Sequence, residues 1–344
     1  MKQTVGTNND PEDKVNSFLE KQTSERPPLI ILTGPTAAGK SALSIELAKR
    51  IGGEIISADS MQVYRHMDIG SAKIMPDQME GIRHHLIDVL EPTEEFNVVL
   101  FQKMAKEALQ GIYERGHIPI VAGGTGFYIQ ALLYDIDFTE NDEDTALRGE
   151  LEQLAAAQGS EALFARLKQI DPESCEVIHA NNVKRVIRAI EFYEKTGMKI
   201  SEHNKLQREN TSPYHFIYFV ISDDRSRLYQ KIEQRVDAMM ELGLVEEVSG
   251  LLARGCTREM VSMQGLGYKE IIDYLEGRST LEEAVYRIKR DTRHFAKRQL
   301  TWFRRERDVV WLEKPEVEYD ETLVHNLLLE FILSVLRERK IIGV

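Results

Sequence analysis

The strongest chemical signal in the sequence is a glycine-rich loop that can bind phosphate. It comprises Gly34, Pro35, Thr36, Ala37, Ala38, Gly39, Lys40 and Ser41, and it matches the pattern G-x-x-x-x-G-K-[ST] between a strand-like run and a helical stretch. In this pattern the glycines let backbone amides surround phosphate oxygens, the lysine adds a charge, and the serine hydroxyl can hold Mg²⁺. The loop therefore predicts a ligand with a di- or triphosphate. A glycine-rich turn without a ligand is the weaker alternative.

An aspartate follows the second predicted strand. Asp59 opens the segment Asp59, Ser60, Met61 and Gln62, at the edge of the sheet where ligands of open α/β folds bind. Facing the phosphate loop, Asp59 is our candidate general base for an attacking acceptor group. The alternative is a helix or turn cap, since Asp before Ser commonly serves that purpose. The position of Asp59 at this edge of the sheet favours its interpretation as a general base.

Two more residues are candidates for contact with a diphosphate. Thr125 lies in the run Gly-Gly-Thr-Gly at 123–126, where a ligand can approach closely, although a helix-entry turn needs the same glycines. Arg235 falls near the apolar face marked by Leu228 and Ile232. An arginine turned inward needs an anion, and a departing diphosphate would supply one. An internal salt bridge is the alternative.

Charge patterning points to a second kind of partner. The chain has a net charge of −12, which alone argues against nucleic acid. The segment 284–307 reverses this balance with Arg287, Lys289, Arg290, Arg293, Lys297, Arg298, Arg304, Arg305 and Arg307 against Asp291 and Glu306, and it also contains Phe295, Trp302 and Phe303. Cations and aromatic rings together suit a phosphate backbone and its bases. A solvated helix face is the alternative, for this segment and for the Lys184, Arg185 and Arg188 cluster.

The order of elements predicts the architecture. Strands are expected at 29–33, 54–58, 85–90, 118–122, 214–221 and 309–312, and helices at 40–51, 97–115, 126–134, from 225 onward and at 321–339. This alternation predicts an α/β fold with a parallel sheet flanked by helices. Between the fourth and fifth predicted strands the sequence is charged and has a helical pattern. This segment predicts an inserted all-helical domain. We expect a tail at 1–28, a core domain at 29–135 and 213–344, and an insertion at 136–212.

Composition limits where the protein works. No apolar run approaches the length of a membrane span, and the N-terminus lacks a hydrophobic signal core. A cytoplasmic protein without membrane contact is expected. Cys175 and Cys256 lie far apart, without the spacing of a zinc site. Nothing signals an obligate protein partner, so a monomer is expected.

The ordered motifs resemble tRNA dimethylallyltransferases, the isopentenylpyrophosphate transferase family. The matching segments are 34–41, 59–64, 84–88, 123–128, 182–191, 235–237, 265–270 and 297–304. The resemblance implies a phosphate-loop fold and the bacterial, zinc-free form. It implies transfer of a dimethylallyl group from dimethylallyl diphosphate to the exocyclic amine of the adenosine 3′-adjacent to the anticodon, with release of pyrophosphate.

The resemblance also implies roles for residues. The loop from Gly34 to Ser41 would bind the prenyl diphosphate, with Ser41 near Mg²⁺ directly or through the diphosphate. Asp59 would accept the proton of the amine, while Thr36, Arg235 and Thr125 would act on the leaving pyrophosphate. Contacts to the anticodon stem-loop would come from Asp59, Ser60, Met61, Gln62, Lys184, Arg185, Arg188, Lys297, Arg298 and Arg304, and the helical insertion would grip the anticodon arm.

Three other functions are compatible with some of the same residues. A nucleotide or small-molecule kinase also needs a phosphate loop, a carboxylate and an arginine. Adenylate isopentenyltransferases prenylate free nucleotides and have less need of the basic segment or the insertion. A non-catalytic RNA-binding protein would have no turnover to lose when Asp59 is replaced.

Overall fold

The computed structural model describes residues 26–138, 145–314 and 320–342. The described residues divide into two units, the first within 1–132 and 213–344 and the second within 133–212. The expected boundaries of the insertion are 136 and 212. The predicted tail at 1–28 lies almost wholly outside the described residues, and Pro28 already belongs to the first strand.

A parallel sheet forms the centre of the first unit, as predicted. Its strands are β1 (Pro28–Thr33), β2 (Gly53–Ala58), β3 (His84–His85), β4 (Ile118–Gly123), β5 (His215–Ser222) and β6 (Val309–Glu313), in the order β3-β2-β4-β1-β5-β6. The register places Thr33 beside Gly123 and Val220. Consequently the loops that follow β1, β4 and β5 leave the sheet at one edge.

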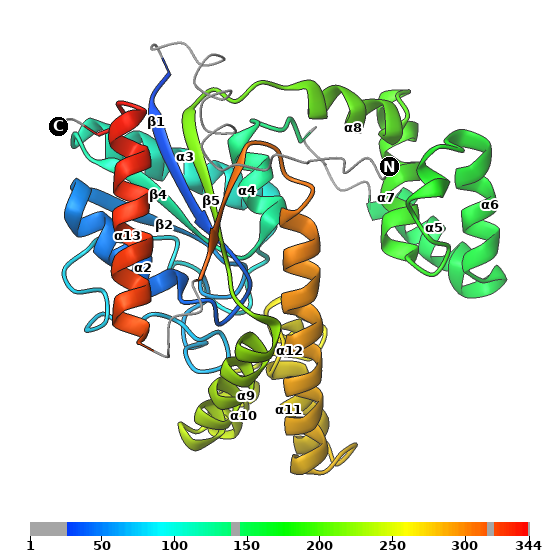
Figure 1. Ribbon diagram of the computed structural model, residues 1–344. Coiled ribbons are helices and arrows are strands. Elements are labelled where there is room, and N and C mark those ends of the chain that lie inside the picture. The colour runs from blue at the N-terminus through cyan, green and yellow to red at the C-terminus, as the bar shows by residue number, and fades with distance from the viewer. Residues whose placement is uncertain (1–25, 139–144, 315–319, 343–344) are drawn as a thin grey trace, which may run out of the picture. The chain divides into compact units, whose positions relative to one another are not determined.

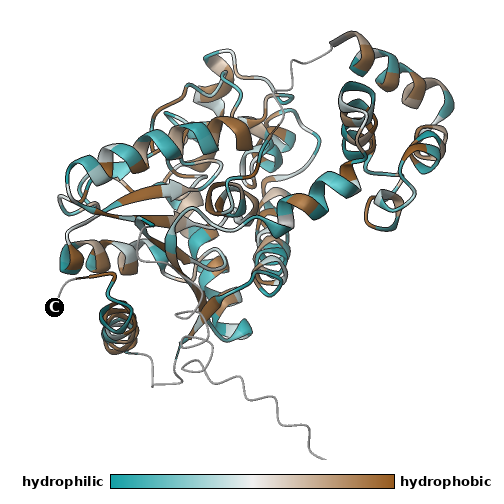
Figure 2. Ribbon diagram, turned by 90° about the horizontal axis from the view of Figure 1, so that it is seen from above, coloured by the Kyte–Doolittle hydropathy of each residue, from teal (hydrophilic) through white to brown (hydrophobic). Residues whose placement is uncertain are grey.

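Helices cover both faces of this sheet. On one face, α2 (Lys40–Ile51) and α13 (Glu321–Glu338) pack against alternate strand residues such as Ile30, Leu32 and Phe219. On the other face lie α3 (Val98–Glu114) and α4 (Gly126–Leu133). The strands are largely hydrophobic along their length, while the helices show one hydrophilic and one hydrophobic side (Figure 2). This is the pattern of a sheet that is buried on both faces, and the predicted fold class is confirmed.

Four helices lie between β5 and β6 in the chain. They are α9 (Arg225–Glu241), α10 (Leu244–Ala253), α11 (Tyr268–Leu275) and α12 (Leu281–Phe303), and they lie side by side in Figure 1. A short 3-10 turn, η2 (Ser262–Gln264), precedes α11. Helix α12 begins with a capping box between Thr280 and Glu283, which fixes the start of this long helix.

The predicted strand at 85–90 is wrong beyond its first residue. Leu86 and Asp88 have φ angles of 62° and 55°, a left-handed conformation that interrupts extended pairing. The carboxylate of Asp88 is drawn to the buried ammonium of Lys73. The segment therefore forms a turn that pairs Asp88 with Lys73, although its apolar pattern predicts a strand.

The second unit is helical in its described part. It contains α5 (Thr145–Gln158), α6 (Ser160–Ile170), the 3-10 turn η1 (Ser174–Glu176), α7 (Val183–Thr196) and α8 (Ile200–Glu209). Leu163, Leu167 and Val186 are among the residues of its core. The buried carboxylate of Asp171 accepts hydrogen bonds from the backbone and hydroxyl groups of Ser174 and Ser201. The unit thus has its own core and its own polar anchor.

Candidate functional site

One cavity of about 620 Å³ collects most of the predicted site residues. It opens at the carboxyl edge of the sheet and is lined by the phosphate loop, the segments after β2 and β4, and side chains of α9 and α12. The predicted residues in its wall are Thr36, Ala37, Gly39, Lys40, Ser41, Asp59, Ser60, Met61, Gln62, Thr125, Arg235 and Arg298. Gly34, Pro35 and Ala38 complete the phosphate loop without lining the cavity.

Local backbone constraints shape the phosphate loop. Gly34 lies against the backbone of Ile221, where a side chain would collide with the carbonyl oxygen. Gly39 has a φ angle of 88° and is the N-cap of α2, a conformation that favours glycine. The helix therefore starts at Lys40, and its N-terminus faces the cavity. Such an end attracts anions through its unpaired amides and its dipole.

Lys40 adds a positive charge to the site, and its surroundings lower the pKa of its ammonium group. Its ammonium donates to the carbonyl oxygens of Gly34 at 3.1 Å and Pro35 at 2.8 Å. Burial, and to a smaller extent the neighbouring Arg235, lower the pKa of Lys40 to about 8, while Asp59 acts in the opposite direction. An anion in the cavity would relieve this unfavourable environment.

Arg235 points to the same place from α9. Its Nη1 lies 3.4 Å from the hydroxyl oxygen of Thr36, and burial lowers the pKa of its guanidinium. Among the described residues, no carboxylate lies within ion-pair distance of Arg235, so the salt-bridge alternative has no partner there. The arrangement leaves a partly buried cation close to the phosphate loop.

Asp59 caps the turn after β2. Its Oδ1 accepts hydrogen bonds from the backbone nitrogens of Met61, at 2.9 Å, and Gln62, at 3.4 Å. The capping alternative is therefore realised, and the same carboxylate also lines the cavity. Both roles are compatible because the turn uses Oδ1, and Oδ2 can face a ligand.

The glycines before and after Thr125 serve close packing. A side chain at Gly123 would collide with Ala58, one at Gly124 with Gln299, and one at Gly126 with the ring of Trp302. None of these glycines has a positive φ angle. Gly123, Gly124 and Thr125 also line the cavity, so this loop packs closely and borders the cavity as well.

Sequence reasoning did not assign a role to Gln299. Its side chain is 6% exposed and bridges Thr36 and Gly124 by hydrogen bonds. A signal was available, since Gln299 shares the apolar face of α12 with the buried residues Ala296 and Phe303. A polar residue on such a face needs buried partners.

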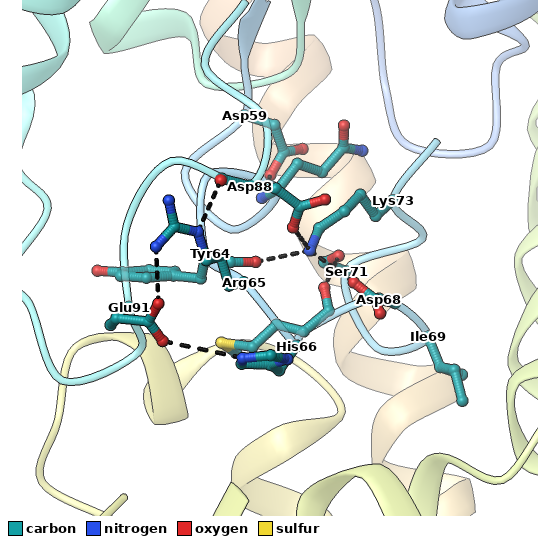
Figure 3. A network of polar contacts seen from close by, with 12 residues as sticks. Asp59, Tyr64, Arg65, His66, Asp68, Ile69, Ser71, Lys73, Asp88 and Glu91 are labelled. Atoms are coloured by element: carbon teal, nitrogen blue, oxygen red, sulfur yellow. Dashed lines mark hydrogen bonds and ion pairs between the residues drawn. The ribbon is translucent and has the colours of Figure 1, made fainter. Parts of the chain in front are cut away.

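A polar network also holds the segment that follows Asp59. The ammonium of Lys73 is fully buried and donates to the Tyr64 carbonyl oxygen and to Asp68, both at 2.6 Å, and to Asp88 (Figure 3). On α10, Glu247 accepts hydrogen bonds from the backbone nitrogens of residues 68–70. Because residues 70–72 line the cavity, these contacts fix one of its walls.

Asp59, Ser60, Met61 and Gln62 line the cavity, and the basic residues predicted to contact RNA fall into two groups. Lys297, Arg298 and Arg304 belong to the first unit and are exposed on or directly after α12. Lys184, Arg185 and Arg188 lie on α7 of the second unit and are exposed as well. Lys297 and Arg304 are not part of the cavity wall. The guanidinium group of Arg298, in α12, lies over the ring of Phe295, and that of Arg305, just after the end of the helix, lies over the ring of Trp302.

Metal binding by protein side chains alone is not evident. In the described ranges, no group of three or more His, Cys, Asp or Glu residues could hold a metal ion. Ser41, exposed in the first turn of α2, lines the cavity. One hydroxyl beside an anion site fits Mg²⁺, which usually combines few protein ligands with substrate phosphates and water.

Comparison with known proteins is consistent across sequence and structure. The sequence model described as IPP transferase matches residues 62–306. The tRNA dimethylallyltransferase of Lachnoclostridium phytofermentans is 60% identical over 315 residues, covering 92% of this chain and 99% of that protein. The corresponding protein of Carboxydothermus hydrogenoformans is 53% identical over 83% of this chain and 91% of its own length.

Solved structures lead to the same family. The tRNA isopentenylpyrophosphate transferase of Bacillus halodurans has a TM-score of 0.68 and 42% identity, covering 92% of this chain and 98% of that chain. A eukaryotic dimethylallyltransferase acting on tRNA has a TM-score of 0.76 and 29% identity, covering 90% and 80%. The chain therefore belongs to the IPP transferase family.

Proposed function

We propose that the protein is a tRNA dimethylallyltransferase. It transfers the dimethylallyl group of dimethylallyl diphosphate to the exocyclic amine of the adenosine 3′-adjacent to the anticodon. One observation carries this proposal: the phosphate loop, Arg235 and Asp59 line a single cavity in a chain that is 60% identical to a tRNA dimethylallyltransferase. Neither the kinase nor the free-nucleotide alternative has comparable support.

The donor would bind with its diphosphate at the N-terminus of α2. Lys40 and Arg235 supply positive charge there, and Thr36 and Thr125 supply hydroxyl groups close by. As the bond between the allylic carbon and the diphosphate oxygen breaks, its electron pair moves to the diphosphate. Preorganised cations stabilise that developing charge at little reorganisation cost. Apolar wall residues such as Ile232 and Phe295 suit the five-carbon group.

The acceptor amine would be activated by Asp59. As the amine nitrogen attacks the allylic carbon, the new N–C bond leaves a positively charged nitrogen, whose proton moves to the Asp59 carboxylate. A positioned base of this kind contributes about 10²–10⁴-fold to a rate. The products are prenylated adenosine, pyrophosphate and one proton.

Mg²⁺ would assist the leaving group. The Ser41 hydroxyl, in the first turn of α2, would hold it together with the diphosphate oxygens. When bound, the ion neutralises charge on the diphosphate.

Recognition of tRNA would begin with phosphate contacts. Lys297, Arg298 and Arg304 provide them in the first unit, and Lys184, Arg185 and Arg188 in the second. The target base must leave its stack to reach Asp59, which costs a few kcal/mol that protein contacts must offset. Ser60, Met61 and Gln62 line the cavity next to Asp59 and can contact the unstacked base.

We also propose that the protein acts in the cytoplasm as a single chain. None of the helices in the described part of the chain combines the length and apolar character needed to cross a bilayer.

The proposal is tested by offering the purified protein alternative substrates in parallel. With Mg²⁺ and labelled dimethylallyl diphosphate, we expect label on unmodified tRNA and none on AMP. With labelled ATP we expect no phosphoryl transfer. Label on AMP alone would identify a free-nucleotide prenyltransferase instead, and ATP turnover without prenyl transfer would identify a kinase.

A further inference from the structure

Gln299 connects the two loops that surround the proposed diphosphate site. Its Oε1 accepts a hydrogen bond from the backbone nitrogen of Thr36 at 2.9 Å, and its Nε2 donates to the carbonyl oxygen of Gly124 at 2.9 Å. The carboxamide thus uses its acceptor on the loop after β1 and its donor on the loop after β4. Since the side chain is only 6% exposed, water competes little for these bonds.

These two bonds fix the threonines beside the leaving group. The bond to the Thr36 nitrogen holds the backbone from which its hydroxyl projects, and that hydroxyl lies 3.4 Å from Nη1 of Arg235. Holding the Gly124 carbonyl sets the peptide that leads into Thr125, whose own nitrogen donates to Ala58 at 3.2 Å. One side chain therefore links the two backbone segments from which the Thr36 and Thr125 hydroxyl groups project.

Close packing leaves the arrangement little freedom. A side chain at Gly124 would collide with the Gln299 amide, and one at Gly126 would collide with Trp302, one turn further along α12. The same helix exposes Lys297 and Arg298 next to Gln299. Helix α12 therefore joins the donor loops to the surface that we assign to RNA.

We propose that Gln299 is a positioning residue for the donor diphosphate. It holds Thr36 and Thr125 at the separation that the diphosphate requires, and it makes the phosphate loop depend on the position of α12. This inference rests on the proposed function. It assigns no contact between Gln299 and the reacting atoms.

The test compares Gln299→Met with Gln102→Met. Gln102 is a matched control, because it is also buried, at 9% exposure, and donates to the Ala131 carbonyl oxygen at 2.8 Å without lining the cavity. We expect both variants to lose stability. Only Gln299→Met should weaken pyrophosphate binding, by about tenfold or more, as for lost buried hydrogen bonds.

Kinetics separate positioning from simple destabilisation. In Gln299→Met we expect a lower kcat and a higher KM for the donor, with the KM for tRNA unchanged. Thr125→Ala should also cost less in the Gln299→Met background than alone, because coupled residues are not additive. Wild-type pyrophosphate affinity and kcat in folded Gln299→Met, or full additivity with Thr125→Ala, would overturn the inference.

A second variant serves if Gln299→Met does not fold. Gln299→Lys retains a donor for Gly124 but has no acceptor for Thr36, and its added positive charge alone would strengthen anion binding. We expect weaker pyrophosphate binding, and tighter binding would contradict the proposal. Pyrophosphate binding needs no transfer reaction. A wild-type protein that binds pyrophosphate without prenylating tRNA would refute the proposed function and leave the role of Gln299 to be judged by binding.

Discussion

Replacement of Asp59 by asparagine separates its two roles. The carboxylate Oδ1 accepts hydrogen bonds from the backbone nitrogens of Met61 at 2.9 Å and Gln62 at 3.4 Å. The asparagine amide oxygen can accept the same two bonds, so the turn should survive with a cost below about 1 kcal/mol. The variant cannot accept the amine proton. Asp59→Asn should therefore abolish the base and preserve the fold.

The expected loss of turnover is large. A missing general base lowers the rate by about 10²–10⁴-fold, equivalent to about 3–5 kcal/mol in the activation barrier. Donor affinity should behave differently. Asp59 favours the charged forms of Lys40 and Arg235, but its own negative charge repels a diphosphate. We therefore expect pyrophosphate to bind to Asp59→Asn as tightly as to the wild type, or more tightly.

The assay is single-turnover prenyl transfer with saturating donor and tRNA, together with calorimetric pyrophosphate binding and thermal unfolding. Asp77→Asn is the matched control, since Asp77 is exposed and does not line the cavity. Asp59→Ala should lose turnover and also destabilise the turn by about 1 kcal/mol. If Asp59→Asn retained wild-type single-turnover rates, or lost activity only through unfolding, the assignment of Asp59 as the base would be refuted.

Three further predictions concern charge. Because burial lowers the pKa of Lys40 to about 8 and a bound anion raises it again, pyrophosphate affinity should fall as the pH rises through about 8, by up to tenfold per unit. Calorimetric measurement of pyrophosphate affinity at several pH values tests this prediction, and an affinity that does not change with pH would contradict it. Lys73→Met should cost about 1–3 kcal/mol in urea unfolding at neutral pH, because it leaves the Tyr64 carbonyl oxygen without its buried donor. Glu54, whose hydrogen bond with Arg115 lowers its pKa to about 2, should stabilise the fold above about pH 4.5. The destabilisation of Glu54→Gln in urea should therefore shrink as the pH falls towards about 2, and a constant difference would argue against it.

The sequence was sufficient to predict the sheet and the phosphate loop because both depend on local patterns. The apolar runs that form β1, β4 and β5 are continuous, as expected for strands buried on both faces. The glycines of 34–39 and the following lysine define the start of α2 without help from distant residues. Asp59 and Arg235 could be placed near this loop by topology and helix periodicity.

Features that depend on long-range partners were harder to predict. The segment 85–90 looks like a strand, but Leu86 and Asp88 have positive φ angles, and the Asp88 carboxylate pairs with the buried ammonium of Lys73. Glu247 holds residues 68–70 from a helix about 180 positions away in sequence. The bridge made by Gln299 spans even more of the chain. Periodicity can show that such residues are buried, but it does not identify their partners.

The most direct test of the account uses two tRNAs that differ at one nucleotide. Purified protein, Mg²⁺ and labelled dimethylallyl diphosphate are incubated with an unmodified tRNA that has adenosine 3′-adjacent to the anticodon, and with the same tRNA carrying guanosine there. We expect label on the first tRNA, release of pyrophosphate in equal amount, and no label on the second. Equal labelling of both tRNAs, or label on neither with an intact donor, would contradict it.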